Sequence, residues 1–272
     1  MVKTKRGVSG TSNAASGAHA GKRIPFPMAN RSRRGGQCFL AGILLAVLLA
    51  AGIGFLGRMS DAIPDDRVRS YSNDVTVFVG TRPEVIKLAP VVEGLAHLGA
   101  PPRVVSTGQH ATMLTETAQS VGLKFTDQLK WKRKSSDLKD LFAEIFKASY
   151  DYLRDERPRL VVIQGDTTTA LAVGLAAAHL HVDVAHVEAG LRTFDPENPF
   201  PEETNRVHLD HLSSLLFAPT TIAESNLLNE GICPDRILMV GNTVVDSLNK
   251  VRASVGPHHG AVRSILQRYV PE

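Results

Sequence analysis

The feature that most constrains the fold begins at Asp74, where short apolar runs alternate with longer segments of helical spacing. We expect strands at residues 75–79, 103–107, 160–163 and 182–187. We expect helices near residues 85–95, 138–153 and 170–180. A polar cluster follows each strand, which is typical of a parallel sheet covered by helices on both faces, with ligands at the strand ends. The pattern predicts an α/β, Rossmann-like doubly wound domain over residues 74–250.

The residues before this domain differ from it in charge. Residues 1–37 are rich in Ser, Gly, Ala, Lys and Arg, a composition that predicts a disordered basic tail. Residues 1–36 hold eight Lys and Arg and no acid, which leaves 23 Lys and Arg against 27 Asp and Glu, a net charge of −4, in residues 37–272. The globular part is acidic, so we expect no nucleic-acid surface.

Residues 38–57 form an uncharged segment that would span about 30 Å as a helix. This length predicts a transmembrane or signal-anchor helix, and hence a membrane-anchored protein. With the basic tail in the cytoplasm, the domain of residues 74–250 would lie on the opposite side of the membrane. The alternatives are a signal-peptide core, an organelle-targeting peptide, or an untranslated extension upstream of Met59, in which case the protein would be cytoplasmic.

Three polar positions are candidates for binding or catalysis. Arg82 and Lys87 flank the start of the first helix, where free amides and the helix dipole favour an anion, although a helix cap with solvated charges would look the same. Asp166 follows a strand and could equally be an N-cap residue. Glu188 emerges from an apolar strand and needs either a partner, for which Arg192 is the nearest candidate, or a chemical role.

The order of the polar clusters resembles the UDP-N-acetylglucosamine 2-epimerase family of the non-hydrolysing type. The matching runs are residues 80–87, 165–169, 186–192, 201–206 and 241–246. The resemblance extends over about residues 74–260 and implies the first of two Rossmann-like domains that face each other across a cleft, as in the GT-B glycosyltransferases. It also implies a homodimer.

The resemblance implies conversion of UDP-N-acetylglucosamine to UDP-N-acetylmannosamine by elimination and re-addition of UDP. No cofactor is expected, in keeping with the absence of a Gly-x-Gly-x-x-Gly run, and the two cysteines lack metal-ligand spacing, so no metal is expected either. Family positions that handle the proton and the developing positive charge match Asp166, Glu188 and Glu202. Substrate-binding positions match the basic and amide residues Arg82, Lys87, Gln109, His110 and Arg192.

Two departures from the family are visible in the sequence. The Gln109-His110 turn, linked in bacterial members to a second, regulatory UDP-N-acetylglucosamine, has Thr112 where a second Gln is common. In the family, the segment that matches residues 241–268 leads into the second domain, so residues 251–272 are expected to be a linker or the start of that domain. The Gly-His-Arg and Ser-Gly-Gly motifs of the second domain do not occur here. We therefore expect an incomplete nucleotide site in this chain. The alternatives are a catalytically inactive, membrane-tethered remnant and a hydrolysing 2-epimerase that releases N-acetylmannosamine and UDP.

Overall fold

The computed structural model describes residues 74–255, apart from 110, 133 and 136, together with Gly260. The predictions for the 1–37 tail, the 38–57 hydrophobic helix and most of the 251–272 segment lie outside these residues. Among the helices within the described ranges, none has both the length and the apolar character that a membrane crossing requires.

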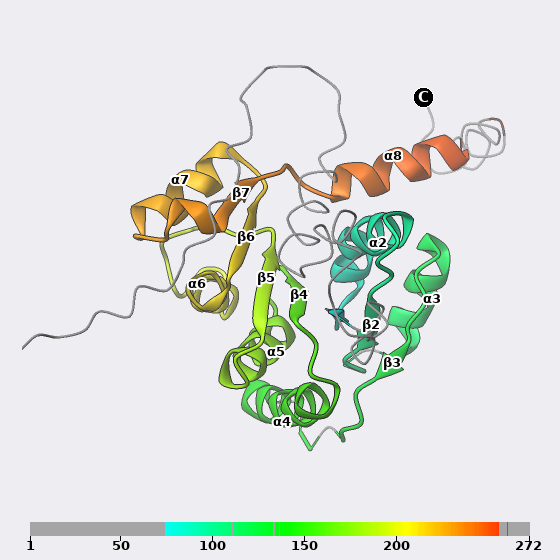
Figure 1. The fold of residues 1–272 in the computed structure, drawn as a ribbon, viewed down its shortest axis with the longest axis horizontal. Coiled ribbons are helices and arrows are strands. Elements are labelled where there is room, and N and C mark those ends of the chain that lie inside the picture. Colours follow the sequence, from blue (N-terminus) through cyan, green and yellow to red (C-terminus); the bar gives the residue numbers. More distant parts are fainter. Residues whose placement is uncertain (1–73, 110, 133, 136, 256–259, 261–272) are drawn as a thin grey trace, which may run out of the picture. The chain divides into compact units, whose positions relative to one another are not determined.

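Seven strands of the described chain form one sheet in the order β3-β2-β1-β4-β5-β6-β7, and every neighbouring pair is parallel. They are β1 Val75–Val79, β2 Arg103–Ser106, β3 Asp127–Gln128, β4 Leu160–Gln164, β5 Asp183–Val187, β6 Leu215–Ala218 and β7 Ile237–Met239. The strand order reverses between β1 and β4 (Figure 1). Parallel sheets of this kind bind ligands at such a switch point, beyond the carboxyl ends of the strands.

Alternate residues of each strand supply two separate cores, because successive side chains of a strand point to opposite faces. In β1, Val75, Val77 and Val79 join the core beneath α2 Arg82–His97 and α3 Ala111–Val121. Phe78 of the same strand joins the core on the other face. All five residues of β1 are buried, which explains why its apolar run shows no polar alternation.

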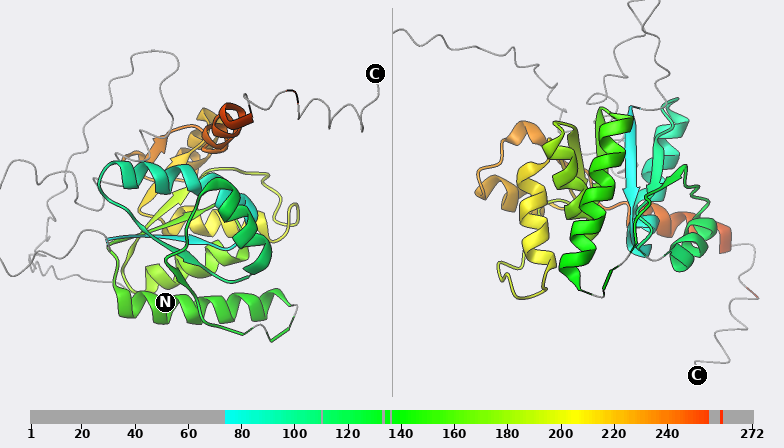
Figure 2. Two further views of the ribbon diagram at one scale, coloured as in Figure 1. Left: turned by 90° about the vertical axis from the view of Figure 1, so that its right-hand side faces the viewer. Right: turned by 90° about the horizontal axis from the view of Figure 1, so that it is seen from below.

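Helices α4 Leu138–Glu156, α5 Thr168–His179 and α6 Glu202–Leu212 cover that other face (Figure 2). Helix α7 Thr221–Asn229 packs on β6 and β7 through a third, smaller core. A 3-10 turn, η3 Pro234–Arg236, precedes β7. The two-sided covering confirms the α/β, Rossmann-like doubly wound domain predicted from the sequence.

The last helix, α8 Val244–Val255, leaves the end of β7 and returns to α2. The hydroxyl of Ser247 donates to the Ile86 carbonyl at 2.5 Å, and Lys250 pairs with Glu93 at 2.8 Å. Figure 1 shows α8 running above α2. Through this return, the turn between β7 and α8 lies close to the switch point.

The four predicted strands are confirmed to within one residue at each end. The predicted helices are confirmed with longer or slightly shifted ends, since α4 continues to Glu156 and α5 begins at Thr168. The boundaries of β3, β6 and β7 were not predicted. These strands are two to four residues long, and their formation depends on the ladder beside them.

Candidate active site

Glu84 joins the two turns that flank the switch point. Its carboxylate accepts the amides of Gly80 at 2.5 Å and Thr81 at 3.0 Å, and the hydroxyl of Thr167 at 2.7 Å. Burial raises the pKa of the Glu84 carboxyl, although the hydrogen bonds from Gly80 and Thr167 act in the opposite direction. Glu84 therefore fixes the turn after β1 against the turn after β4.

This arrangement corrects one expectation about the start of α2. The amides of Gly80 and Thr81 are occupied by Glu84, and residue 83 is a proline without an amide hydrogen, so these positions do not offer free donors to an anion. Arg82, the first residue of α2, has an exposed side chain that forms no ion pair with any residue the structure describes. Its guanidinium thus remains the main cationic group at this helix end.

Glu188 lies at the centre of the site, directly after β5. Its Oε2 accepts from Lys87 Nζ and from Gln164 Nε2, both at 2.5 Å, and its Oε1 accepts from Asn242 Nδ2 at 2.8 Å. The side chain is only 12% exposed. The partner of Glu188 is therefore Lys87, from α2, and not Arg192 as the sequence suggested. Four segments of the chain meet on this one carboxylate.

The backbone of Glu188 has a positive φ of 72°, the left-handed region that non-glycine residues seldom adopt. The amides of Glu188 and Ala189 both donate to the Phe217 carbonyl of β6, each at 3.1 Å, which holds the turn in place. Strained backbone of this kind is concentrated at functional sites. The turn directs the carboxylate from the end of β5 toward Lys87.

Asp166, Glu188 and Glu202 form the acidic group of the site. The Asp166 carboxylate pairs with Arg206 of α6 at 2.5 Å, and the Asp166 carbonyl accepts from Asn205 at 2.8 Å. Burial raises the pKa of Asp166, Arg206 opposes this, and the charges of Glu202 and Glu188 add to it. Asp166 is not the N-cap of α5, because the hydroxyl of Thr167 accepts the Ala170 amide instead. The structure thus places Asp166 within electrostatic reach of both other predicted acids.

The neighbouring acids Glu202 and Glu203 have different roles in the fold. Glu203 is buried and accepts the amides of Thr193, at 3.0 Å, and Phe194, at 2.9 Å. Burial opposes ionisation of Glu203, but the bonds from Thr193 and Phe194 lower its pKa overall. Glu202, the first residue of α6, is partly exposed. Glu203 holds the preceding loop, and Glu202 is the acid available to a ligand.

Arg192 is not brought to this group. Its side chain is 1% exposed and pairs with Asp210 at 2.7 Å and with both carboxylate oxygens of Glu230, at 2.6 and 2.7 Å. The sequence-based expectation that Arg192 binds substrate is therefore not met by its position. The turn after β5 carries side chains in two directions. Glu188 points toward Lys87, whereas Arg192 points toward Asp210 in the interior.

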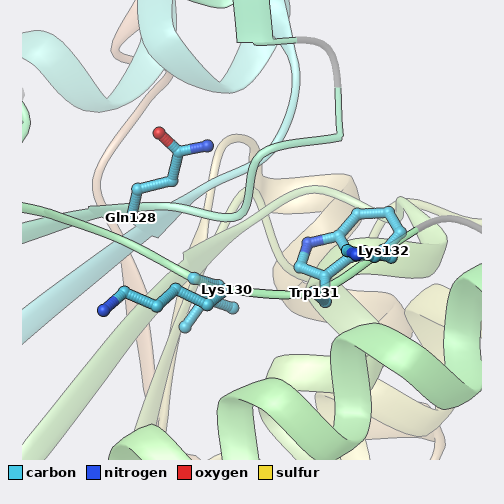
Figure 3. Close-up of a pocket in the computed structure, with 5 residues that line it drawn as sticks. Gln128, Lys130, Trp131 and Lys132 are labelled. Carbon is cyan, nitrogen blue, oxygen red and sulfur yellow. The ribbon is translucent and has the colours of Figure 1, made fainter.

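Gln109 lies at the turn after β2, where its side-chain oxygen accepts the hydroxyl of Thr169 from α5. His110 lies outside the described residues. Beside this turn, a hollow of about 570 Å³ is lined by residues 128–132 (Figure 3). The indole of Trp131 donates to the Thr107 carbonyl at 2.5 Å. Trp131, which lines the hollow, therefore also holds the turn that carries Gln109.

Two residues of the site were not assigned a role from the sequence. Gln164 reads as the last residue of a buried strand, and Asn242 lies within a matched run to which no chemistry was attached. The signal that could have identified Gln164 is its position as the first polar residue at the end of β4. The signal for Asn242 is its place directly beyond β7, since strand ends of a parallel sheet meet at one edge.

The arrangement is suited to acid–base chemistry beside a negatively charged leaving group. Three carboxyl groups act on one another here: Glu188 is hydrogen-bonded by a lysine and two amides, Asp166 is partly buried with a raised pKa, and Glu202 is partly exposed. Carboxyls in different environments can give up and accept protons in the same reaction. The cations Lys87, Arg206 and Arg82 lie on neighbouring elements.

Comparison with known proteins identifies close relatives. The profile of a family described as UDP-N-acetylglucosamine 2-epimerase matches residues 96–270. A curated protein of that name from Methanocaldococcus jannaschii is 42% identical over 178 residues, which is 64% of this chain and 47% of the relative. Another from Neisseria meningitidis serogroup A is 41% identical over 175 residues, with the same two shares.

Solved structures agree with these relatives. The 2-epimerase from Neisseria meningitidis, bound to UDP-GlcNAc, has a TM-score of 0.65 at 36% identity and covers 72% of this chain and 53% of its own. The Methanocaldococcus jannaschii 2-epimerase, in complex with UDP-GlcNAc and UDP, has a TM-score of 0.61 at 41% identity, covering 65% and 48%. The chain thus spans about half the length of the curated relatives that it matches.

Proposed function

The chain belongs to the UDP-N-acetylglucosamine 2-epimerase family, and from this premise we propose that it interconverts UDP-N-acetylglucosamine and UDP-N-acetylmannosamine. One observation carries the proposal for these residues. Asp166 and Glu188 follow the adjacent strands β4 and β5, Glu188 pairs with Lys87, and the charges of Glu188 and Glu202 act on Asp166. Such a group is suited to inversion at C2 of a nucleotide sugar.

The reaction proceeds through elimination because the C2 proton is not adjacent to a carbonyl. The bond between C1 and the diphosphate oxygen breaks, UDP leaves with the electron pair, and a base removes the C2 proton, so that a C1=C2 double bond forms. In the reverse addition, UDP attacks C1 while a proton is delivered to the opposite face of C2. The product differs from the substrate only in the configuration at C2, and no electrons are gained or lost.

We assign the acids by their surroundings. Glu188 receives three hydrogen bonds, one of them from Lys87, which fix its carboxyl group in place and suit it to stabilise positive charge at C1. Asp166, whose pKa is raised by burial, is suited to accept and return a proton. Glu202, partly exposed at the start of α6, is the candidate for the opposite face of C2.

The departing diphosphate needs positive charge, which Arg82 and Lys87 supply in this proposal. Arg82 is exposed, and Lys87 is 23% exposed and held by Glu188. An ammonium between a carboxylate and a phosphate can strengthen its contact with the phosphate as negative charge develops there. Gln109 and His110 are proposed to line the same side of the nucleotide.

We also propose that residues 74–255 correspond to the first of two Rossmann-like domains of GT-B type, and that a homodimer is the working form. The support is the length of the relatives, of which this chain matches about half. In such an arrangement the switch point between β1 and β4 faces the second domain. Most of the uridine contacts would then come from outside residues 74–255.

The test is incubation with UDP-N-acetylglucosamine in deuterated water, followed by NMR. We expect deuterium at C2 and formation of UDP-N-acetylmannosamine, either with the 272-residue chain or with a chimera in which residues 1–255 precede the second half of the Methanocaldococcus jannaschii relative. Glu188→Gln should reduce the exchange about 10²-fold or more, as loss of one electrostatic group in a site typically does. A folded chimera without exchange would overturn the proposal.

A further inference from the structure

Beneath the acidic group lies a fully buried pair, His186 of β5 and Asp210 of α6, whose side chains are both 0% exposed. The imidazole Nδ1 lies 2.7 Å from Asp210 Oδ1. The other ring nitrogen, Nε2, lies 2.6 Å from the Gly165 carbonyl oxygen. Each ring nitrogen thus faces an oxygen, and the ring connects β5 to the turn that follows β4.

The oxygens determine where the ring protons lie. A carbonyl oxygen only accepts, so Nε2 must carry a hydrogen to bond Gly165. Asp210 also accepts from the Gly190 amide at 3.0 Å and from Arg192 at 2.7 Å. Asp210 thus connects the ring to the turn after Glu188.

Asp210 is also held by charge. Burial opposes ionisation of Asp210, but His186 and Arg192 lower its pKa below the ordinary value. Arg192 in turn pairs with Glu230, which follows α7. Asp210 therefore serves as an acceptor both for the ring and for the Gly190 amide.

We infer that His186 acts as a positioning residue that sets the turns of Asp166 and Glu188 relative to each other. The ring bonds the carbonyl of Gly165, which directly precedes Asp166, and His186 itself lies two residues before Glu188. Asp210 completes the link, since it bonds the Gly190 amide two residues after Glu188. Only the effect on catalysis rests on the proposed function.

The bond from the ring to Gly165 has its own test. The full chain is labelled with ¹⁵N-histidine, and the His186 signals are assigned by their loss in His186→Gln. We expect Nε2 of His186 to carry a directly bonded proton, because the Gly165 carbonyl only accepts. A ring whose Nε2 carries no proton overturns the inference, whatever the enzyme's activity.

The positioning role is tested with two isosteric variants in the deuterium-exchange assay. His186→Gln places an amide nitrogen near the former Nε2 and retains a donor to Gly165, whereas His186→Asn places it near the former Nδ1 and retains only the bond to Asp210. We expect kcat to fall in both, on the order of 10²-fold for His186→Asn and less for His186→Gln. KM should stay within about threefold because neither variant touches a substrate contact.

The matched control is His208→Gln, on the exposed face of α6, where the ring bonds only the Thr204 carbonyl at 2.7 Å. This variant should leave kcat unchanged. Equal kcat values for wild type and both His186 variants would overturn the positioning role, as would a change confined to KM. If the wild type and the chimera show no exchange at all, the proposed function fails, and the NMR measurement still decides whether the His186 ring donates to Gly165.

Discussion

Glu84 illustrates, at the scale of a single residue, how a carboxylate can support the site without belonging to the chemistry. It is buried, it accepts from three donors on two turns, and its pKa is raised from 4.5. The folded state therefore takes up a proton at a higher pH than the unfolded state does. Its contribution to stability is fully present below about 4.5, the unfolded value, and is lost as pH rises through the folded value.

Replacement of Glu84 by Gln removes this titration and keeps an acceptor for the Gly80 amide. We expect the melting temperature of Glu84→Gln, relative to wild type, to rise between about pH 4 and pH 8. Differential scanning fluorimetry across this range measures the effect, with Glu93→Gln on the exposed face of α2 as the control. A difference that is constant with pH would contradict the prediction.

The acids of the site were predictable as residues, whereas their partners were not. Asp166 and Glu188 follow apolar strands, which marks them as groups at the sheet edge. The pairing of Glu188 with Lys87, 101 residues earlier, depends on how α2 lies over β1 and β4. Arg192 is adjacent to Glu188 in sequence but is directed into the interior. The sequence located the turn, but closeness in sequence did not predict the directions in which its side chains point.

At the scale of elements, the close approach of α7 to the turn after β5 depends on Gly190. This glycine has a φ of 84°, and a β-carbon built on it would lie 2.3 Å from the Ala223 carbonyl oxygen of α7. Backbone at that distance has to move, and the turn it would displace also carries Glu188. Gly190 thus couples the packing of α7 to the geometry of the site.

We expect Gly190→Ala to destabilise the protein far more than Gly231→Ala does. Gly231 has a similar φ of 80° but nothing within 4 Å of its built β-carbon, so its substitution costs only the left-handed strain, about 1–2 kcal/mol. Gly190→Ala adds overpacking against α7, about 3 kcal/mol more. Urea unfolding of both variants measures the difference, and equal costs would refute the steric explanation.

The elements differed in how far the sequence predicted them. Strands β1 and β4 each have four buried apolar residues out of five, and β5 has three, so their apolar composition identified them. Strand β3 has two residues and β7 has three, which is too few to show any periodicity. Each forms because the backbone of a neighbouring parallel strand offers it hydrogen-bond partners. Gln164 was absent from the predicted strand because its polar side chain ends the apolar run, whereas its pairing with β5 makes it part of β4.

At the scale of the molecule, α8 presents an apolar surface that no described residue covers. Val244, Val245 and Leu248 are between 40% and 65% exposed. Contiguous apolar area of this kind promotes association. The surface is continuous with the turn that carries Asn242, which bonds Glu188 at 2.8 Å. Contacts made on α8 therefore lie near the site.

We expect the chain to associate in a concentration-dependent manner, and the variant Leu248→Glu to reduce this association. The control is Ile222→Glu, which removes a 73% exposed apolar residue from α7 instead. Sedimentation velocity over a range of concentrations measures the effect. If both variants associate as the wild type does, the surface of α8 does not drive association.

The contacts that meet on Glu188 have a consequence for the order in which the protein folds. Its partners Lys87, Gln164 and Asn242 belong to segments that follow β1, end β4 and follow β7. Contacts between such distant parts of a chain form late, because each requires a long loop to be closed. The carboxylate cannot acquire all its partners until strands from both sides of the sheet are in place. On the proposed function, recovery of the C2 exchange during refolding would thus report assembly of the sheet from β1 to β7, and an intermediate without these strands would show no exchange even with every acid present.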